Sequence, residues 1–82
     1  MNHIKVLLFA TLRDYVGSKS LELEIPPGTT VGGLMDLLVG KYPRLEKVRD
    51  SMMAAINREF AADEQVIPDG SEIALIPPVS GG

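Results

Sequence analysis

The sequence contains no cysteine and only one histidine, His3. The absence of cysteine excludes a disulfide framework, a thiolate nucleophile and a cysteine metal site. His3 stands at the beginning of the chain, where we expect a solvated residue at a strand end rather than a general base or a metal ligand. The chain therefore offers few of the side chains on which enzymes build reactive centres.

Long hydrophobic runs and a basic surface are also missing. No apolar run approaches the roughly 20 residues that a membrane-spanning helix needs. The first residues lack the cleavage pattern of a signal peptide, so we expect a cytoplasmic location. With 11 acidic and 8 basic side chains, the net charge is −3. This balance argues against nucleic acid as a partner and is compatible with a basic protein surface.

The acidic residues between the predicted elements do not form a recognisable metal site. Asp63, Glu64 and Asp69 have a spacing that matches no calcium loop, so we expect solvated turns there. We expect no bound metal and no bound cofactor. The four methionines are interpreted as the initiator and as core-filling side chains: Met1, Met35, Met52 and Met53.

Eighty-two residues are enough for one domain. A chain of this size buries about 60% of its unfolded surface, which provides one modest core. The hydrophobic fraction of 45% and the charged fraction of 23% are ordinary for a globular protein.

The first third of the chain predicts two strands joined by a short helical turn. Apolar residues on both faces of residues 4–10 are typical of a central strand. One face carries Ile4, Val6 and Leu8, and the other carries Lys5, Leu7 and Phe9. Residues 11–17 have helical spacing and end at Gly17. Residues 20–25 alternate between polar and apolar, which predicts a strand with one wet face.

The middle of the chain predicts one main helix. Thr29 or Thr30 is a suitable N-cap, and apolar residues follow at helical spacing from Val31 to Val39. Gly40 and Pro43 are expected to end this helix. Residues 45–50 are interpreted as a further short helical turn.

The last third predicts two more strands and a brief edge segment. We expect a strand at residues 53–57, a turn at 57–60, an edge segment at 66–67 and a tight turn at Asp69-Gly70. The final strand, residues 73–76, is apolar on both faces. Because the first and last strands are the most apolar, they should be neighbours at the centre of the sheet. The order predicts an α+β, ubiquitin-like β-grasp fold.

The last residues suggest a domain at 1–76 followed by an extended tail at 77–82. Pro77 and Pro78 cannot donate to a sheet ladder, so they end the strand and favour an extended exit. Gly81 and Gly82 have no side chain to pack. From Pro77 onward the tail would reach roughly 20 Å. A frayed chain end is the ordinary interpretation of such a segment.

Four segments, in chain order, resemble the MoaD/ThiS sulfur-carrier family. They are LFATLRD at 8–14, PPGTTVG at 26–32, INRE at 56–59 and DGSEIALIPPVSGG at 69–82. The closing IPPVSGG is the specific part, and it resembles the molybdopterin branch of the family. The main departure is Gly33, where relatives often carry a charged helix former, which bears on helix stability rather than on function.

The resemblance implies a sulfur carrier that acts as the small subunit of molybdopterin synthase. A ubiquitin-activating-like enzyme would use ATP to adenylate the carboxylate of Gly82. Sulfur from a persulfide donor would then displace AMP and leave a terminal thiocarboxylate. The tail residues Pro77, Pro78, Val79, Ser80 and Gly81 would insert into the large synthase subunit. Catalytic groups are expected on the partners, not on this chain, which also has no side-chain thiol to compete for the sulfur.

The chemistry of the tail fits this scheme. A terminal carboxylate has a pKa of about 3.3–3.7, so at neutral pH it is an anion and a poor electrophile. Adenylation supplies a leaving group and splits one difficult step into two. The glycines let a partner backbone approach closely. Prolines reduce the entropy lost when the tail is threaded into an enclosed site.

A docking surface beside the tail is the second hypothesis. One helix covers one face of a sheet, yet the first and last strands are apolar on both faces. Leu7, Phe9, Ala74 and Ile76, or the alternative set, should therefore form an apolar patch unless loops cover it. Lys5, Arg13 and Arg58 are either surface charges or partner contacts, and we include Arg13 in the predicted docking surface.

Two other functions stay open on the sequence alone. The same tail chemistry would serve a sulfur carrier for thiamine or tRNA thiolation, or a ubiquitin-like modifier of protein lysines. A β-grasp interaction module with an incidental Gly-Gly end is the third possibility. Such a module would tolerate loss or extension of Gly82, whereas a carrier would not.

Overall fold

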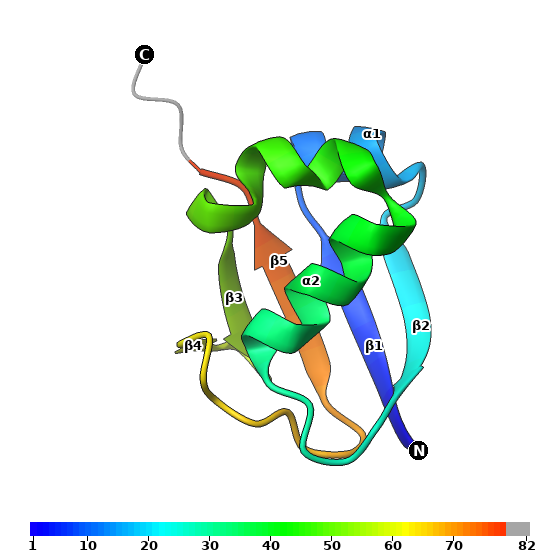
Figure 1. The fold of residues 1–82 in the computed structure, drawn as a ribbon, viewed down its shortest axis with the longest axis vertical. Helices are drawn as coiled ribbons and strands as arrows, with labels where there is room; N and C mark the ends of the chain where they lie inside the picture. The colour runs from blue at the N-terminus through cyan, green and yellow to red at the C-terminus, as the bar shows by residue number, and fades with distance from the viewer. Residues whose placement is uncertain (79–82) are drawn as a thin grey trace.

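The computed structural model describes residues 1–78, which form a five-stranded sheet with helix α2 across one face (Figure 1). The strand order is β2-β1-β5-β3-β4. The strands are β1 (Asn2–Leu8), β2 (Ser20–Ile25), β3 (Met53–Ile56), β4 (Glu59–Ala61) and β5 (Glu72–Ile76). The helices are α1 (Thr11–Val16), α2 (Val31–Lys41) and the 3-10 helix η1 (Pro43–Ser51). This is the predicted β-grasp arrangement.

The first and last strands pair in parallel at the centre of the sheet. The pairing runs from Lys5 opposite Glu72 to Leu8 opposite Leu75. β2 pairs with β1, and β3 pairs with both β5 and β4, all antiparallel. The predicted central position of the two most apolar strands is therefore confirmed. The two strands predicted in the first third of the chain, joined by a short helical turn, are confirmed as β1 and β2.

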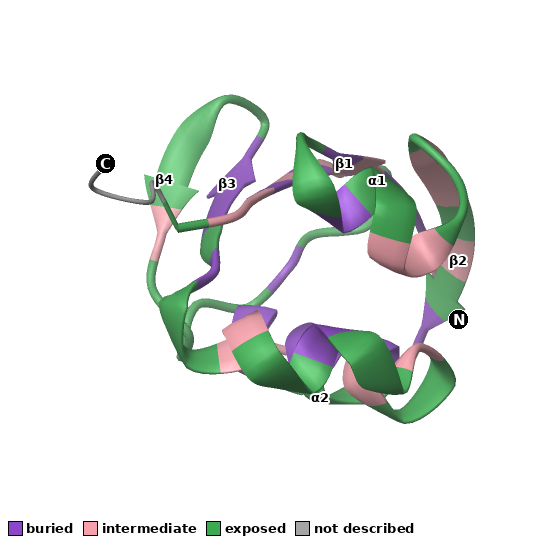
Figure 2. Ribbon diagram, turned by 90° about the horizontal axis from the view of Figure 1, so that it is seen from above, coloured by how far each residue is buried: buried purple, intermediate pink, exposed green. Residues whose placement is uncertain are grey.

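Every second residue along the strands contributes to one hydrophobic core, which lies between the sheet and α2. The buried residues of the strands and of α2 form this core, and Figure 2 marks them in purple on the ribbon. The side chains with the least exposure are Ile4, Val6, Leu8, Leu12, Ile25, Leu34, Met35, Leu38, Leu45, Ile67, Ile73 and Leu75. The predicted inner face of β1, Ile4 with Val6 and Leu8, is confirmed.

The ends of α2 follow from its sequence. The N-cap is Thr30, whose Oγ1 accepts a hydrogen bond from the backbone N–H of Gly33 at 3.1 Å. The helix ends at Lys41, between Gly40 and Pro43, the two residues predicted to end it. Pro43 then begins η1, which is longer than the short turn predicted at residues 45–50.

The turn predicted at residues 57–60 is wrong in its second half, because Glu59 and Phe60 belong to β4. The turn itself is only Asn57-Arg58, with φ values of 48° and 75°. Positive φ at both positions is the geometry of a tight two-residue hairpin, which usually carries glycine in second place. Because arginine occupies the second position, the sequence lacks the glycine by which such a hairpin is usually predicted.

The edge segment predicted at residues 66–67 is not a strand of the sheet. Val66 makes an isolated bridge to Thr30, and Ile67 is fully buried in the core. The loop before it is joined to the start of α2 by backbone hydrogen bonds: Val31 N–H donates to Gln65 O at 2.9 Å, and Gly32 N–H donates to Asp63 O at 2.8 Å.

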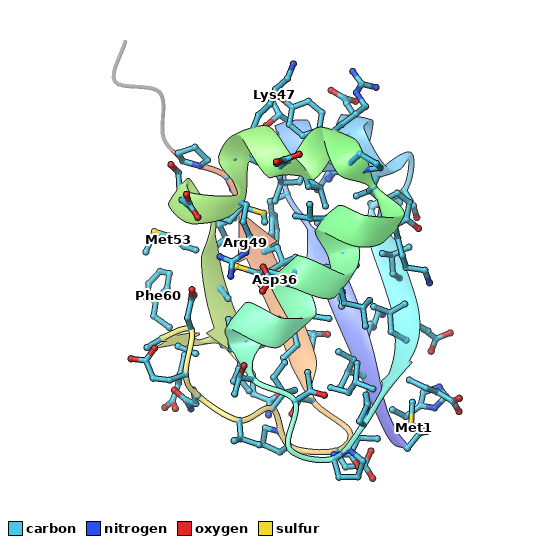
Figure 3. All side chains as sticks on the ribbon, viewed as in Figure 1. Met1, Asp36, Lys47, Arg49, Met53 and Phe60 are labelled. Atoms are coloured by element: carbon cyan, nitrogen blue, oxygen red, sulfur yellow. The ribbon has the colours of Figure 1, made fainter. Side chains whose placement is uncertain are left out.

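Arg49 of η1 connects α2 to this loop. Its Nε donates to Asp36 at 2.9 Å, and its Nη atoms lie 3.4 Å from an Asp63 carboxylate oxygen and 3.3 Å from Gly32 O. Figure 3 shows the Arg49 and Asp36 side chains pointing toward one another. The hydrogen bond with Asp36, against the opposing effect of burial, raises the pKa of Arg49 above its ordinary value. These contacts of Arg49 stabilise the packing of η1 against α2 and against the loop that contains Asp63.

None of the helices within residues 1–78 is long and apolar enough to cross a membrane.

The two glycines in the first turn of α2 should respond oppositely to alanine. A Cβ on Gly33 would meet side-chain atoms no closer than 3.4 Å, so Gly33→Ala should raise the free energy of unfolding by about 0.5–1 kcal/mol. A Cβ on Gly32 would lie 3.3 Å from both Cβ and backbone O of Asp63. Since that oxygen also accepts the Gly32 hydrogen bond, overpacking of about 1–3 kcal/mol should outweigh the helical gain.

Denaturant unfolding of Gly32→Ala and Gly33→Ala beside the wild type measures this difference. Equal stabilisation by both substitutions would show that the loop at Asp63 is free to move, contrary to its backbone hydrogen bonds.

Candidate functional site

The strand that leads to the predicted tail ends at Ile76, whose partner across the ladder is Met53. Pro77 is half-buried and Pro78 is exposed, and neither belongs to a strand. Since proline has no N–H, neither residue can extend the ladder. The predicted tail residues Val79, Ser80, Gly81 and Gly82 lie outside the described residues, so their predicted roles stay predictions.

Beside this strand end lies a sheet face that α2 does not cover. Two rows of side chains cross it at the end where β5 stops. In the first row, Leu7 is opposite Ala74, Ala74 is opposite Ala55, and Ala55 is opposite Phe60. The second row joins Phe9, Ile76 and Met53. We call these seven residues the open face: Leu7, Phe9, Met53, Ala55, Phe60, Ala74 and Ile76.

The open face brings together the apolar residues predicted to form a patch. Leu7, Ala74 and Ile76 are half-buried, and Phe9 is 40% exposed. Of the two sets left open by the sequence, it is the one with Leu7 and Phe9 that faces away from α2. No loop within residues 1–78 covers these side chains completely, since all four are partly exposed to solvent. The alternative that the chain's own loops bury this patch is therefore excluded.

Met53 and Phe60 extend the open face and were not predicted to belong to it. They are 50% and 70% exposed, respectively. Figure 3 shows both side chains at the β3–β4 side of the molecule. The interpretation of Met53 as core filler is wrong, whereas Met35 and Met52 are buried as predicted. Because Met53 precedes the buried Ala54 in a strand, alternation could have indicated that Met53 lies on the open face. No such pattern indicated the position of Phe60, because β4 was not predicted.

Arg13 lies at one corner of the open face, where β1 turns into α1. The turn is made by Ala10, whose φ of 51° is unusual for a residue with a side chain. The chain reverses there, and Arg13 Nε donates to the backbone O of Leu8 at 2.9 Å. This bond fixes the guanidinium against the end of β1, beside Phe9.

On the same face of the sheet as the open face, the end far from Ile76 carries charged residues. Lys5 lies between Glu22 on β2 and Glu72 on β5 in the strand register. Next to them, His3 Nδ1 lies 3.5 Å from a carboxylate oxygen of Glu24. The sheet surface therefore changes from charged to apolar along β1 and β5, and its apolar part is at the tail end.

The other candidate polar residues lie apart from the open face or serve the fold. His3 is exposed in β1, and its backbone N–H donates to Asp69 at 2.7 Å. Asp63 is held by Arg49. Arg58 is exposed in the β3–β4 turn. Within residues 1–78 no three His, Asp or Glu side chains are grouped as metal ligands.

The described part of the chain also provides no buried reactive side chain. Ser71 is the only buried polar residue among residues 1–78, and its Oγ donates to Pro68 O at 2.6 Å. A buried hydroxyl that is already bonded to a carbonyl has a structural role. The described residues therefore present a partly exposed apolar surface next to the end of β5.

Comparison with known proteins places the chain among sulfur carriers and small modifiers. A model described as the ThiS family matches residues 6–82. A molybdopterin synthase sulfur carrier subunit from Arabidopsis thaliana is 44% identical, with 96% of this chain and 82% of the relative covered. One from Mycobacterium tuberculosis is 39% identical over the whole of both chains. The crystal structure of SAMP1 from Haloferax volcanii is 36% identical with a TM-score of 0.83, covering 98% of this chain and 99% of that one.

The exposure of Phe60 predicts that this residue contributes little to stability. Phe60→Thr keeps a good strand former and should change the free energy of unfolding by about 0.5 kcal/mol or less. Ile73→Ala, on the opposite, buried face of the sheet, should lower the free energy of unfolding by about 2–5 kcal/mol. Thermal or urea unfolding of the two variants measures the contrast. A loss above about 2 kcal/mol for Phe60→Thr would mean that its ring is packed into the core.

Proposed function

Because the chain belongs to the ThiS family over residues 6–82, we propose that it is the sulfur-carrier small subunit of molybdopterin synthase. The observation that carries the proposal is its likeness over nearly all of its length to proteins of that name. The fold supports it, because β5 leads directly into the tail and an apolar surface flanks that strand end.

The proposed cycle begins at the carboxylate of Gly82. A carboxylate oxygen attacks the α-phosphorus of ATP on an adenylating partner, which releases pyrophosphate and forms a mixed anhydride with AMP. The terminal sulfur of a persulfide donor attacks the carbonyl carbon, and AMP leaves. A thiol then cleaves the resulting sulfur–sulfur bond and leaves the thiocarboxylate. In the large subunit this sulfur is transferred to a pyranopterin precursor to build the dithiolene.

This chain's own contribution is presentation rather than catalysis. The described residues hold no buried acid, base or metal cluster. We therefore propose that this chain supplies the reacting carboxylate of Gly82 and that the partners supply the catalytic groups. We propose that it binds no cofactor and that ATP is used by the adenylating partner. A cytoplasmic location stays a prediction from the sequence.

The open face is proposed as the docking surface for these partners. Leu7, Phe9, Ala74 and Ile76 lie next to the exit of the tail, and Arg13 borders them. A partner that covers this apolar area gains binding free energy while it receives the tail. The large subunit and the adenylating enzyme would use the surface in turn, because both need the same chain end.

A second function is supported by the likeness to small archaeal modifier protein 1. That likeness covers nearly the whole of both chains. A protein modifier would use the same adenylated Gly82 but transfer it to a lysine amine. The two proposals therefore share the activation step and differ in the acceptor.

Intact-mass analysis tests the carrier proposal. After incubation with ATP, the cognate adenylating enzyme and a persulfide donor, we expect one oxygen of the chain to be replaced by sulfur. Deletion of Gly82, or extension beyond it, should abolish the exchange without changing the fold. Addition of the large subunit and the pterin precursor should then return the carrier to its carboxylate form.

The outcomes separate the alternatives. A chain that undergoes no exchange with its cognate enzyme is not a sulfur carrier, and the interaction-module interpretation would replace the proposal. A chain that gains sulfur but is not discharged by the large subunit serves another thiolation pathway. Covalent attachment to lysines would support the modifier.

Phe9→Asp tests the docking surface. A carboxylate in the middle of an apolar contact should weaken binding to the large subunit by at least about tenfold. Leu37→Asp is the matched control, since Leu37 is 37% exposed, close to the 40% of Phe9, but lies on α2 in the other layer. Calorimetric titration measures both affinities. Equal binding by the two folded variants would exclude the open face as the docking surface.

A further inference from the structure

A hollow at one corner of the open face combines apolar walls with positive charge. It has a volume of about 230 Å³. Its lining residues are Lys5, Leu7, Leu8, Phe9, Arg13, Lys19 and Ser20. Leu7 and Phe9 make it continuous with the apolar rows of the open face. The hollow therefore belongs to the surface proposed to meet a partner, but it differs from the rest of that surface in charge.

The charge of the hollow runs against that of the whole chain. The net charge of the sequence is −3, yet among the described residues three cationic side chains and no carboxylate line this hollow. Asp14 lines only the adjoining depression, which shares Arg13 and Lys19. Lys5 lies between Glu22 and Glu72 in the strand register, which reduces its local effect. Arg13 and Lys19 have no carboxylate oxygen within 4.0 Å among residues 1–78, where the ion pairs are those of His3 and Arg49.

Arg13 is held in place before any partner binds. Its Nε donates to Leu8 O, the last residue of β1, at 2.9 Å. This leaves the terminal guanidinium nitrogens available at the rim of the hollow. A guanidinium fixed in this way loses less side-chain entropy when it meets a carboxylate, and it can bind both carboxylate oxygens.

We propose that the hollow receives an acidic anchor of the large subunit, a carboxylate side chain beside an apolar one. The carboxylate would lie between Arg13 and Lys19, and the apolar side chain would rest on Leu7 and Phe9. A free inorganic anion would not need the apolar walls, and an apolar side chain alone would leave the cations unused. The proposal rests on the proposed function and adds the chemistry by which the partner is recognised.

The experiment measures binding of the full-length chain to its cognate large subunit at low and at physiological salt. Arg13→Gln should weaken binding about tenfold or more and Lys19→Gln about threefold, because each removes one charge facing a carboxylate in a partly desolvated contact. Both variants should also show a smaller loss of affinity with added salt than the wild type. Arg13→Lys should recover part of the affinity lost in Arg13→Gln, since it restores the charge without the planar fork.

Lys41→Gln is the matched control, because Lys41 ends α2 on the other layer and does not line the hollow. It should leave both affinity and salt dependence unchanged. Thermal unfolding of each variant separates loss of fold from loss of contact. If Arg13→Gln affects folding through its bond to Leu8 O, Lys19→Gln, whose side chain has no such bond, decides the result.

Affinities and salt dependences equal to the wild type in Arg13→Gln and Lys19→Gln would overturn the acidic anchor. The proposed function would survive that result if the wild type still exchanges oxygen for sulfur and binds the large subunit. Failure of the wild type in the sulfur exchange would instead overturn the proposed function, and with it the anchor.

Discussion

The parallel pairing of β1 with β5 is the constraint on which the rest of the structure depends. It places the two most apolar strands at the centre of the sheet, where each has neighbours on both edges. Because the two strands run in the same direction, both end at the same end of the sheet. β1 turns there into α1 and positions Arg13, while β5 continues there into Pro77. The hollow, the open face and the start of the tail are neighbours for this one reason.

The second consequence is the division of the sheet into two unlike faces. One helix can cover only one side, so the alternating residues of β1 and β5 are either deeply buried or left at the surface. Val6, Leu8, Ile73 and Leu75 stabilise the core. Leu7, Phe9 and Ile76 contribute far less to it, and their partial exposure has an energetic cost that a bound partner would remove. Stability and docking therefore depend on different residues of the same strands, so either can change without the other.

Much of this arrangement could be predicted from the sequence, because the spacing of apolar residues clearly indicates β1, β2, α2 and β5. The central pair followed from the apolar character of both its strands, and the patch of Leu7, Phe9, Ala74 and Ile76 followed from the pair. The residues whose positions or contacts were not predicted are those whose environment depends on segments distant in sequence. β4 follows a turn with arginine where glycine is usual, so Phe60 was not placed on the sheet. Arg49 is tied to Asp36 and Asp63, 13 and 14 residues away, a distance at which no local pattern indicates contact.

The central pair also has a consequence for synthesis on the ribosome. β1 is made before the other four strands and its parallel partner β5 after them, so closing this contact requires all the elements between them. A nascent chain that stops before Glu72 lacks the middle strand of its sheet and keeps an unpaired edge on β1. Val6 and Leu8 then lack their ladder partners Ile73 and Leu75, so part of the core stays exposed and chaperones and proteases can recognise the chain as incomplete. Only a chain that has been made as far as its last strand can display the assembled open face to a partner.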